Sequence, residues 1–312
     1  MISIVIVNYN GKHFLENCLY SLSTQTYKDY EVVIVDNASS DGSVAYIQHY
    51  YPWVKLIQSE FNSGFAGGVN QGIKNSKGKY ILTLNNDTTI HTQFLEKMLE
   101  CIESEDKVGS CASKMVYPDG RINSTGICVS RSGAAWDRGM LEHDENQYDE
   151  IEEIFGPCAG AALYRKEMLE EIGLFDKDFF LYFEDVDIAF RAQLAGWKCL
   201  YTPYAKVTHI HGGTAGVGSD IAIYYGNRNI LWCAIKNFPL KLLLISLPWI
   251  VGRNIAIIPY YALNGKGSII LKAKISALKG LLKTIKKRQS FNDKDCQNLD
   301  KFINKWCKAK ST

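Results

Sequence analysis

Short apolar runs alternate with helical patterns through about the first 115 residues of this 312-residue chain. Four runs have the apolar, β-branched composition of buried strands: 2–7, 31–35, 54–57 and 80–84. Three segments between them have the spacing of helices: 13–23, 43–51 and 67–75. This alternation predicts an α/β fold with a mostly parallel sheet. Because the first run follows no charged leader or cleavage site, we expect it to be a buried strand and not a signal peptide.

Polar side chains follow each of the predicted strands. They are Asn8, then Asp36 and Asn37, then residues 60–64, and then Asn85, Asn86 and Asp87. Ligands of open α/β sheets bind beyond the carboxyl ends of the strands, so these side chains should converge on one crevice. Asp36 could accept a hydrogen bond from a nucleotide base or ribose there. Turn formation is the alternative, and it suits Asp41 and Ser43 better than Asp36, which still belongs to the strand.

Residues 62–70, with Gly64 and Asn70, form a glycine-rich turn that leads into a predicted helix. Such a turn can bring backbone N–H groups to a phosphate. It lacks the Gly-x-Gly-x-x-Gly spacing and follows the third strand instead of the first, so the case for a dinucleotide-binding fold is weak.

Residues 85–87 are candidates for a divalent cation site. Mg²⁺ and Mn²⁺ bind oxygen ligands in proteins, often one or two carboxylates together with substrate phosphates. Asp87 could hold such an ion and Asn85 could lend a carbonyl oxygen, with an Asx-turn as the alternative. His209 and His211 end a later β-like run, and histidine is a common metal ligand. We therefore expect Mg²⁺ or Mn²⁺ as a cofactor.

An acidic cluster opens a short apolar helix at 184–191, directly after four apolar or aromatic residues. Glu184, Asp185 and Asp187 supply its three carboxylates. A carboxylate in a dry, fixed place can take a proton from an attacking hydroxyl. Helix capping, or a pair between Asp187 and Arg191 one turn later, is an equally good account of Asp187. It does not explain two adjacent acids against aromatic residues, so Asp185 is the predicted base.

An irregular segment follows the predicted strands and helices. Residues from about 116 to 155 are irregular and rich in Gly and Ser, with an acidic stretch from 142 to 153, which indicates an insertion or flap.

The nine cysteines are scattered without a Cys-x-x-Cys pair. Scattered thiols suit a reducing compartment better than a disulfide framework or a structural zinc site. We therefore expect the catalytic part to be cytoplasmic.

The last quarter of the chain differs from the rest in charge. From Lys236 onward there are 16 Lys and Arg against 3 Asp and Glu, a net charge of +13, whereas the residues before it carry 19 against 30, a net charge of −11. We accordingly predict two parts, 1–235 and 236–312. A basic tail on an acidic body indicates a polyanionic partner, either nucleic acid or an anionic membrane.

Apolar residues in this tail favour the membrane over nucleic acid. The apolar run at 242–265 is long enough to span a bilayer, but Arg253, Pro248 and Pro259 interrupt it and count against a span. Five later residues share one helical face: Leu271, Ile275, Leu278, Leu282 and Ile285. Five lysines flank that face: Lys272, Lys279, Lys283, Lys286 and Lys287. This pattern is typical of an interfacial helix on anionic lipid, and a helix docked on the body is the alternative.

Taken together, these motifs resemble the inverting family 2 glycosyltransferases of GT-A fold, in the rhamnosyltransferase-like branch. The similarity runs from residue 2 to about residue 239. Its landmarks occur in order along the chain: Asn8, Asp36, 62–70, Asp87, 160–165, 173–176, Glu184 with Asp185, Trp197, Pro203, His209 and Arg228. Each landmark alone is weak, but the ordered set is highly specific.

The resemblance implies roles for several of these residues. Asp36 would contact the nucleotide base, Asp87 would be the last acid of an Asp-x-Asp metal motif, Asp185 the catalytic base, and His209 a metal or phosphate contact. Asn85 stands where the motif has its first acid, which puts metal affinity in doubt. We predict further nucleotide or donor contacts at Asn8, Asn37, Gly64, Asn70, Asn86 and Arg228, and contacts with the acceptor or donor sugar at Gly160, Ala161 and Trp136.

The predicted reaction is an inverting transfer from a nucleotide-diphosphate sugar, dTDP-rhamnose or a UDP-sugar, to a hydroxyl of a polysaccharide or lipid-linked glycan. Glu184 would orient Asp185 or bind the acceptor. The expected location is the cytoplasmic membrane face, attached peripherally to anionic lipid, with no nucleic-acid partner and with oligomerisation through the tail left open. A nucleotidyltransferase of sugar phosphates and a catalytically silent nucleotide-sugar-binding protein are the alternatives.

Overall fold

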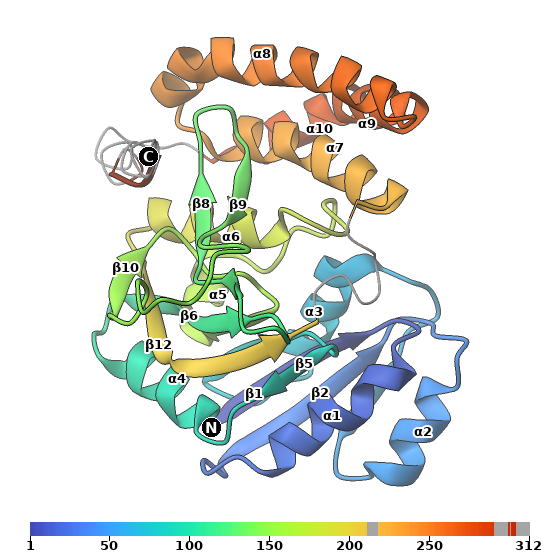
Figure 1. Cartoon of the computed structure of the whole chain (residues 1–312), viewed down its shortest axis with the longest axis vertical. Helices are drawn as coiled ribbons and strands as arrows, with labels where there is room; N and C mark the ends of the chain where they lie inside the picture. Colours follow the sequence, from blue (N-terminus) through green and yellow to red (C-terminus); the bar gives the residue numbers. More distant parts are fainter. Residues whose placement is uncertain (211–217, 290–298, 300, 304–312) are drawn as a thin grey trace.

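The computed structural model describes residues 1–210, 218–289, 299 and 301–303. An α/β body lies below a layer of C-terminal helices in Figure 1. The predicted histidine His211 lies outside the described residues.

The helices and strands cover most of this part of the chain. The strands are β1 (Ile2–Asn8), β2 (Tyr30–Asp36), β3 (Lys55–Gln58), β4 (Tyr80–Leu84), β5 (Thr88–Ile90), β6 (Val108–Val116), β7 (Ile122–Ser124), β8 (Ile127–Val129), β9 (Ala135–Asp137), β10 (Glu152–Ile154), β11 (Ala161–Arg165) and β12 (Lys198–His209). The helices are α1 (Lys12–Ser23), α2 (Ser43–Tyr50), α3 (Gly64–Lys74), α4 (Phe94–Glu103), α5 (Lys166–Ile172), α6 (Glu184–Leu194), α7 (Asp220–Asn237), α8 (Leu240–Leu263), α9 (Gly267–Lys279) and α10 (Leu281–Lys286).

The first four strands have the predicted βαβ rhythm. β1 pairs in parallel with β2 and β4, and β2 pairs in parallel with β3. Because successive side chains of a strand point to opposite faces, Ile4 and Val5 enter different cores. Ile4 packs with residues of α1 and α4, and Val5 packs with residues of α3 and α5. Helices therefore cover both faces of the sheet, which is why these strands are apolar throughout.

The sheet becomes mixed beyond β4, because β11 lies antiparallel between β4 and β6. β12 then pairs in parallel with β6, and β5 and β10 pair antiparallel with β12. The predicted insertion at 116–155 contains β7, the β8–β9 hairpin and β10. This hairpin rises from the body toward α7 and α8 (Figure 1).

The C-terminal helices pack directly against the body. Phe238 and Leu242 share a core with Phe190 of α6 and Val129 of β8. The predicted division between 235 and 236 falls inside α7, so no linker separates the two parts there. Pro248 and Pro259, which we expected to interrupt the apolar run, both lie within a continuous α8.

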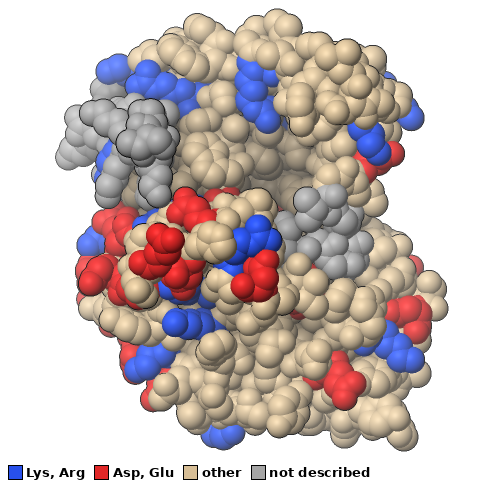
Figure 2. All heavy atoms as spheres, viewed as in Figure 1, with Lys and Arg blue, Asp and Glu red and all other residues tan. Residues whose placement is uncertain are grey.

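Part of the charge asymmetry is neutralised inside the molecule. Lys236, Lys283 and Lys287 form ion pairs with Asp176 and Asp178, which belong to the body. Figure 2 shows that the acidic side chains on the displayed face gather mainly below the helical layer, which is itself largely uncharged with separate groups of Lys and Arg.

Candidate active site

A cavity of about 480 Å³ opens between α7 and the carboxyl ends of β1 and β4. Ten of the residues predicted for the site line it: Asn37, Gly64, Asn85, Asn86, Asp87, Trp136, Gly160, Glu184, Asp185 and His209. They come from the edge of the sheet, the β8–β9 hairpin, the start of α6 and the end of β12. The structure thus brings the polar strand ends and the acidic cluster to one place, as expected. The molecular surface in Figure 2 is hollowed between the helical layer and the body.

Asp36 and Asn8 lie behind the cavity wall in a hydrogen-bonded chain. Asn8 Nδ2 donates to Asp36 Oδ2 at 3.0 Å, and Asn86 Nδ2 donates to Asn8 Oδ1 at 2.8 Å. Asp36 Oδ1 accepts from the backbone N–H of Ser39 at 2.9 Å. Both Asp36 and Asn8 are buried. These hydrogen bonds therefore fix Asn86 and the turn after β2 at the cavity, and direct contact of Asp36 with a nucleotide base stays a prediction.

Asn37 organises the glycine-rich turn at 62–70. Its amide nitrogen donates to Asn62 Oδ1 at 2.9 Å and to the Gly64 carbonyl at 3.1 Å, and its amide oxygen accepts from the Ser63 N–H at 3.0 Å. Gly64 has φ of +73°, and a Cβ there would lie 2.3 Å from the carbonyl oxygen of Phe180. Only glycine fits this position, where α3 begins against the chain that precedes α6.

Three residues predicted for the site lie elsewhere. Both amide atoms of Asn70 pair with the backbone of Phe175, at 2.7 and 3.0 Å. Arg228 packs against aromatic rings of α7 and donates to backbone carbonyls before α6. Ala161 is buried in β11. None of the three lines the cavity, so their side chains support its walls in place of the ligand contacts that we predicted for them.

Asp87 and His209 form a pair of ligands suited to a divalent cation. Asp87 Oδ1 lies 3.2 Å from His209 Nε2, and both side chains are buried at the cavity wall. His209 Nδ1 lies 2.8 Å from Asn123 Oδ1, an acceptor, so Nδ1 carries a hydrogen and the contact orients the ring with Nε2 toward Asp87. Asn85 Nδ2 lies 3.3 Å from the same Nε2.

This donor set fits Mg²⁺ or Mn²⁺ only in part. No group of three or more His, Cys, Asp and Glu side chains among the described residues could hold an ion. A carboxylate oxygen and an imidazole nitrogen suit Mn²⁺, and such ions commonly take their remaining ligands from substrate phosphates and water. The residues therefore fit an ion that is held jointly with a diphosphate.

Asp185 stands at the first turn of α6, facing the cavity. Its Oδ1 accepts from the backbone N–H of Val186 at 2.8 Å, and its Oδ2 accepts from that of Ala159 at 3.3 Å. Burial, followed by the charge of Asp137, raises the pKa of Asp185 from 3.8 to about 6. A carboxylate with this pKa is mostly ionised at neutral pH yet basic enough to accept a proton.

The two neighbouring acids differ in environment. Glu184 is buried and its Oε2 has no hydrogen-bond partner within the described structure. Burial, followed by the charge of Asp185, raises the pKa of Glu184 well above the ordinary value, so this position favours the neutral form of its carboxyl group. Asp187 instead pairs with Arg191 and Lys236. Burial opposes its ionisation, but these cations outweigh burial and lower its pKa. The alternative explanation that the sequence offered for Asp187, an ion pair with Arg191, is therefore confirmed.

Sequence reasoning missed two residues of the site. Asp137 lines the cavity from the β8–β9 hairpin, next to Trp136, which is 46% exposed. Asn123 fixes the ring of His209 from β7. Both lie in the irregular insertion, where no periodicity singles out a residue. The adjacent Trp136 and Asp137 pair was the only local signal.

Comparisons with known proteins agree with this arrangement. A family model described as glycosyl transferase family 2 matches residues 3–173. An uncharacterised glycosyltransferase of Bacillus subtilis is 33% identical over 210 residues, which cover 67% of this chain and 73% of the relative. The N-acetylglucosaminyl-diphospho-decaprenol L-rhamnosyltransferase of Mycobacterium tuberculosis is 26% identical over 239 residues, which cover 69% of this chain and 78% of the relative.

Solved structures with the same fold share less sequence. A mannosyltransferase from Pyrobaculum calidifontis, in complex with GDP-Man and Mn²⁺, aligns over 90% of this chain and 86% of its own with a TM-score of 0.56 and 16% identity. GalNAc-T7, with UDP, GalNAc and Mn²⁺, aligns over 92% of this chain and 56% of its own with a TM-score of 0.63 and 17% identity. These likenesses confirm the predicted GT-A fold.

Proposed function

Because the chain belongs to glycosyl transferase family 2 and is a glycosyltransferase, we propose that it transfers a sugar from a nucleotide-diphosphate donor to a hydroxyl of a glycan with inversion at the anomeric carbon. The observation that carries this proposal is the placement of Asp185 in one cavity with Asp87, His209 and Asn86. A base and a diphosphate site facing a common space are what a single displacement requires.

The proposed step uses one nucleophile and one base. The acceptor oxygen attacks the anomeric carbon, the bond from that carbon to the diphosphate oxygen breaks, and Asp185 takes the proton of the acceptor hydroxyl. Glu184, which lines the same cavity, would orient Asp185 or bind the acceptor. Asp87 and His209 would hold Mg²⁺ or Mn²⁺, which when bound would neutralise charge on the departing diphosphate. Attack opposite the leaving group inverts the configuration.

For the donor we propose dTDP-rhamnose or a UDP-sugar. The rhamnosyltransferase name of the Mycobacterium tuberculosis relative supports the first of these. The cavity wall also supports it, because Ile127, Cys158 and Phe180 offer apolar surface to a deoxy sugar. For the acceptor we propose a lipid-linked or growing polysaccharide, with exposed Trp136 at the cavity rim as a platform for its sugar ring.

We further propose that the helical layer attaches the enzyme to an anionic membrane. All five residues of the predicted apolar face are exposed, from 49% at Leu271 and Ile285 to 76% at Leu282. Within the described residues, α8 is the one helix long and apolar enough to cross a membrane, and 17% of its most apolar window is buried. Exposed apolar area of this kind marks a membrane or partner site. A lysine-flanked apolar face favours attachment at the interface over a span.

The decisive experiment incubates purified full-length protein, Mn²⁺ and a short lipid-linked glycan with a panel of dTDP- and UDP-sugars. We expect one donor to yield an extended glycan of inverted configuration, with Asp185→Asn as the inactive control. In a parallel reaction with a sugar phosphate and a nucleoside triphosphate, release of pyrophosphate from the triphosphate with formation of a nucleotide sugar would instead identify a nucleotidyltransferase. Tight donor binding without transfer to any acceptor would contradict the proposal.

A further inference from the structure

The loop of residues 173–183, between α5 and α6, forms one wall of the cavity and leads directly into Glu184 and Asp185. Phe180, Tyr182 and Phe183 line the cavity from this loop, and they have φ of +66°, +66° and +72°. Left-handed backbone is costly for residues with large side chains, so it persists only where surrounding contacts fix it.

Side chains of α7 fix the loop through its carbonyl groups. Asn229 Nδ2 donates to the carbonyls of Phe179, Leu181 and Tyr182 at 2.9, 2.9 and 2.7 Å. Arg228 Nη2 donates to the Phe179 carbonyl at 2.9 Å. Because Asn229 and Arg228 both belong to α7, one helix of the C-terminal layer holds the backbone of the loop.

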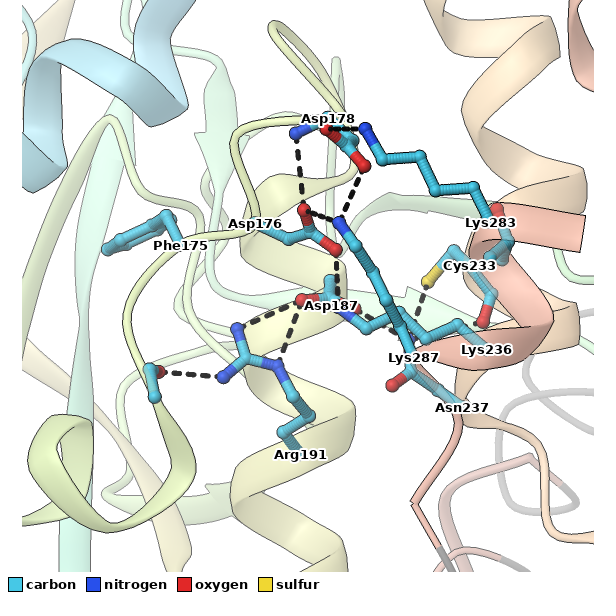
Figure 3. A network of polar contacts seen from close by, with 12 residues as sticks. Phe175, Asp176, Asp178, Asp187, Arg191, Cys233, Lys236, Asn237, Lys283 and Lys287 are labelled. Atoms are coloured by element: carbon cyan, nitrogen blue, oxygen red, sulfur yellow. Dashed lines mark hydrogen bonds and ion pairs between the residues drawn. The ribbon is translucent and has the colours of Figure 1, made fainter. Parts of the chain in front are cut away.

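Three lysines of the C-terminal layer hold the other end of the loop. Asp176 accepts from Lys236 at 2.8 Å and from Lys287 at 2.5 Å. Asp178 accepts from Lys283 at 2.7 Å and from Lys287 at 2.6 Å (Figure 3). Lys287 therefore bridges both carboxylates. Lys283 is 67% exposed, and an ion pair of this kind contributes little.

The network continues into the helix that carries the base. Lys236 also lies 2.7 Å from Asp187, which is fully buried and pairs with Arg191 of the same helix (Figure 3). Burial opposes ionisation of Asp176, but Lys236 and Lys287 outweigh it and lower its pKa. The contacts thus join α7 and the chain after α10 to the first turn of α6.

We propose that Lys287 and Lys236 are positioning residues of the active site. Through Asp176, Asp178 and Asp187 they fix the 173–183 loop, and so set the place of Asp185 and of the aromatic wall. The C-terminal layer would then be part of the catalytic unit as well as the membrane attachment. This inference rests on the proposed role of Asp185 as the base.

Kinetics of three variants test the inference. Because a displacement of about 1 Å at a reacting group can lower a rate by about 10²-fold, we expect Lys287→Ala to lower kcat by about 10- to 100-fold. Donor KM should stay within about threefold, since the nucleotide side of the cavity is untouched. Lys287→Arg should restore most of the rate. Lys28→Ala, which removes an exposed lysine from the body of the protein, is the control for charge and should behave as wild type.

Hydrogen exchange of residues 179–187 supplies a readout that does not need activity. We expect faster exchange there in Lys287→Ala than in Lys28→Ala, with other segments unchanged. If Lys287→Ala does not fold, Asp178→Asn removes a partly exposed partner of the same lysine and should show the same effects more weakly. Unchanged exchange, or faster exchange with normal kcat, would overturn the inference. Absence of transfer by the wild type would refute the proposed function instead, and the exchange result would still decide whether the lysines fix the loop.

Discussion

The pH dependence of transfer provides a direct test of Asp185 as the base. Its pKa is raised from 3.8 to about 6, first by burial and then by Asp137. This shift corresponds to about 3 kcal/mol of differential interaction between the two protonation states. A base must be ionised to act, so kcat/KM should fall about tenfold for each pH unit below 6 and should level off above it.

Substitution of Asp137 tests the electrostatic cause. Asp137→Asn keeps the shape of the side chain and removes the like charge that opposes ionisation of Asp185. The inflection should therefore move toward acid pH, while burial, the larger cause, still acts to raise the pKa of Asp185. Asp185→Asn should lower kcat by about 10²- to 10⁴-fold and abolish the acid limb.

The pH dependence of stability that arises from Asp185 differs from the expected pH dependence of the rate. The folded-state pKa is raised above the unfolded value, so between about pH 4 and 6 the folded protein binds more protons than the unfolded chain. The contribution of Asp185 to stability therefore falls as pH rises through this window, opposite to the expected rise in rate. The assay measures initial rates from about pH 4.5 to 8 at saturating Mn²⁺. An acid limb that persists in Asp185→Asn, or an inflection unmoved in Asp137→Asn, would refute the reasoning.

Three further predictions follow from the same structure. Asp87→Ala should lose divalent-cation stimulation, measured by titration of Mn²⁺ and Mg²⁺ into chelator-treated enzyme, and full activity in excess chelator would contradict a metal role. Asn229→Ala removes the side-chain donor of the Leu181 and Tyr182 carbonyls, whereas the Phe179 carbonyl keeps Arg228, and should destabilise the protein by about 1–3 kcal/mol, measured by denaturant unfolding. An unchanged midpoint would show that other contacts suffice. The double variant Leu278→Asp with Leu282→Asp should no longer bind anionic vesicles in flotation assays. Equal binding of the wild type to neutral and anionic vesicles would reject an electrostatic contribution of the lysines. Binding of the wild type to neither kind of vesicle would indicate a different partner.

The N-terminal half of the site could be predicted because its signals are local. Strands buried on both faces are apolar throughout, and a parallel sheet brings their carboxyl ends together, so Asn86 and Asp87 could be placed at the ligand edge from the sequence. The acidic pair at Glu184 and Asp185 was visible because charged residues seldom stand among aromatic ones without a partner.

Other residues took roles that local signals do not specify. Arg228 and Asn70 have side chains that often contact ligands, but in the fold they donate hydrogen bonds to the backbone carbonyls of Phe179 and Phe175. The role of Asp137 depends on where a short hairpin places it relative to Asp185. Lys236 and Lys287 belong to a basic tail by composition, yet both pair with Asp176, which lies 60 and 111 positions earlier in the chain.

The α/β class, the strand ends that line the cavity, the acidic pair beside them and the apolar face of the C-terminal helices could be predicted from the sequence, because each depends on residues close together in the chain. Only the tertiary structure decided which charges neutralise one another, how the pKa values of Glu184 and Asp187 diverge, and which helix supports the loop before Asp185. Burial and the distance between charges govern those properties, and both arise only when segments far apart in sequence pack together.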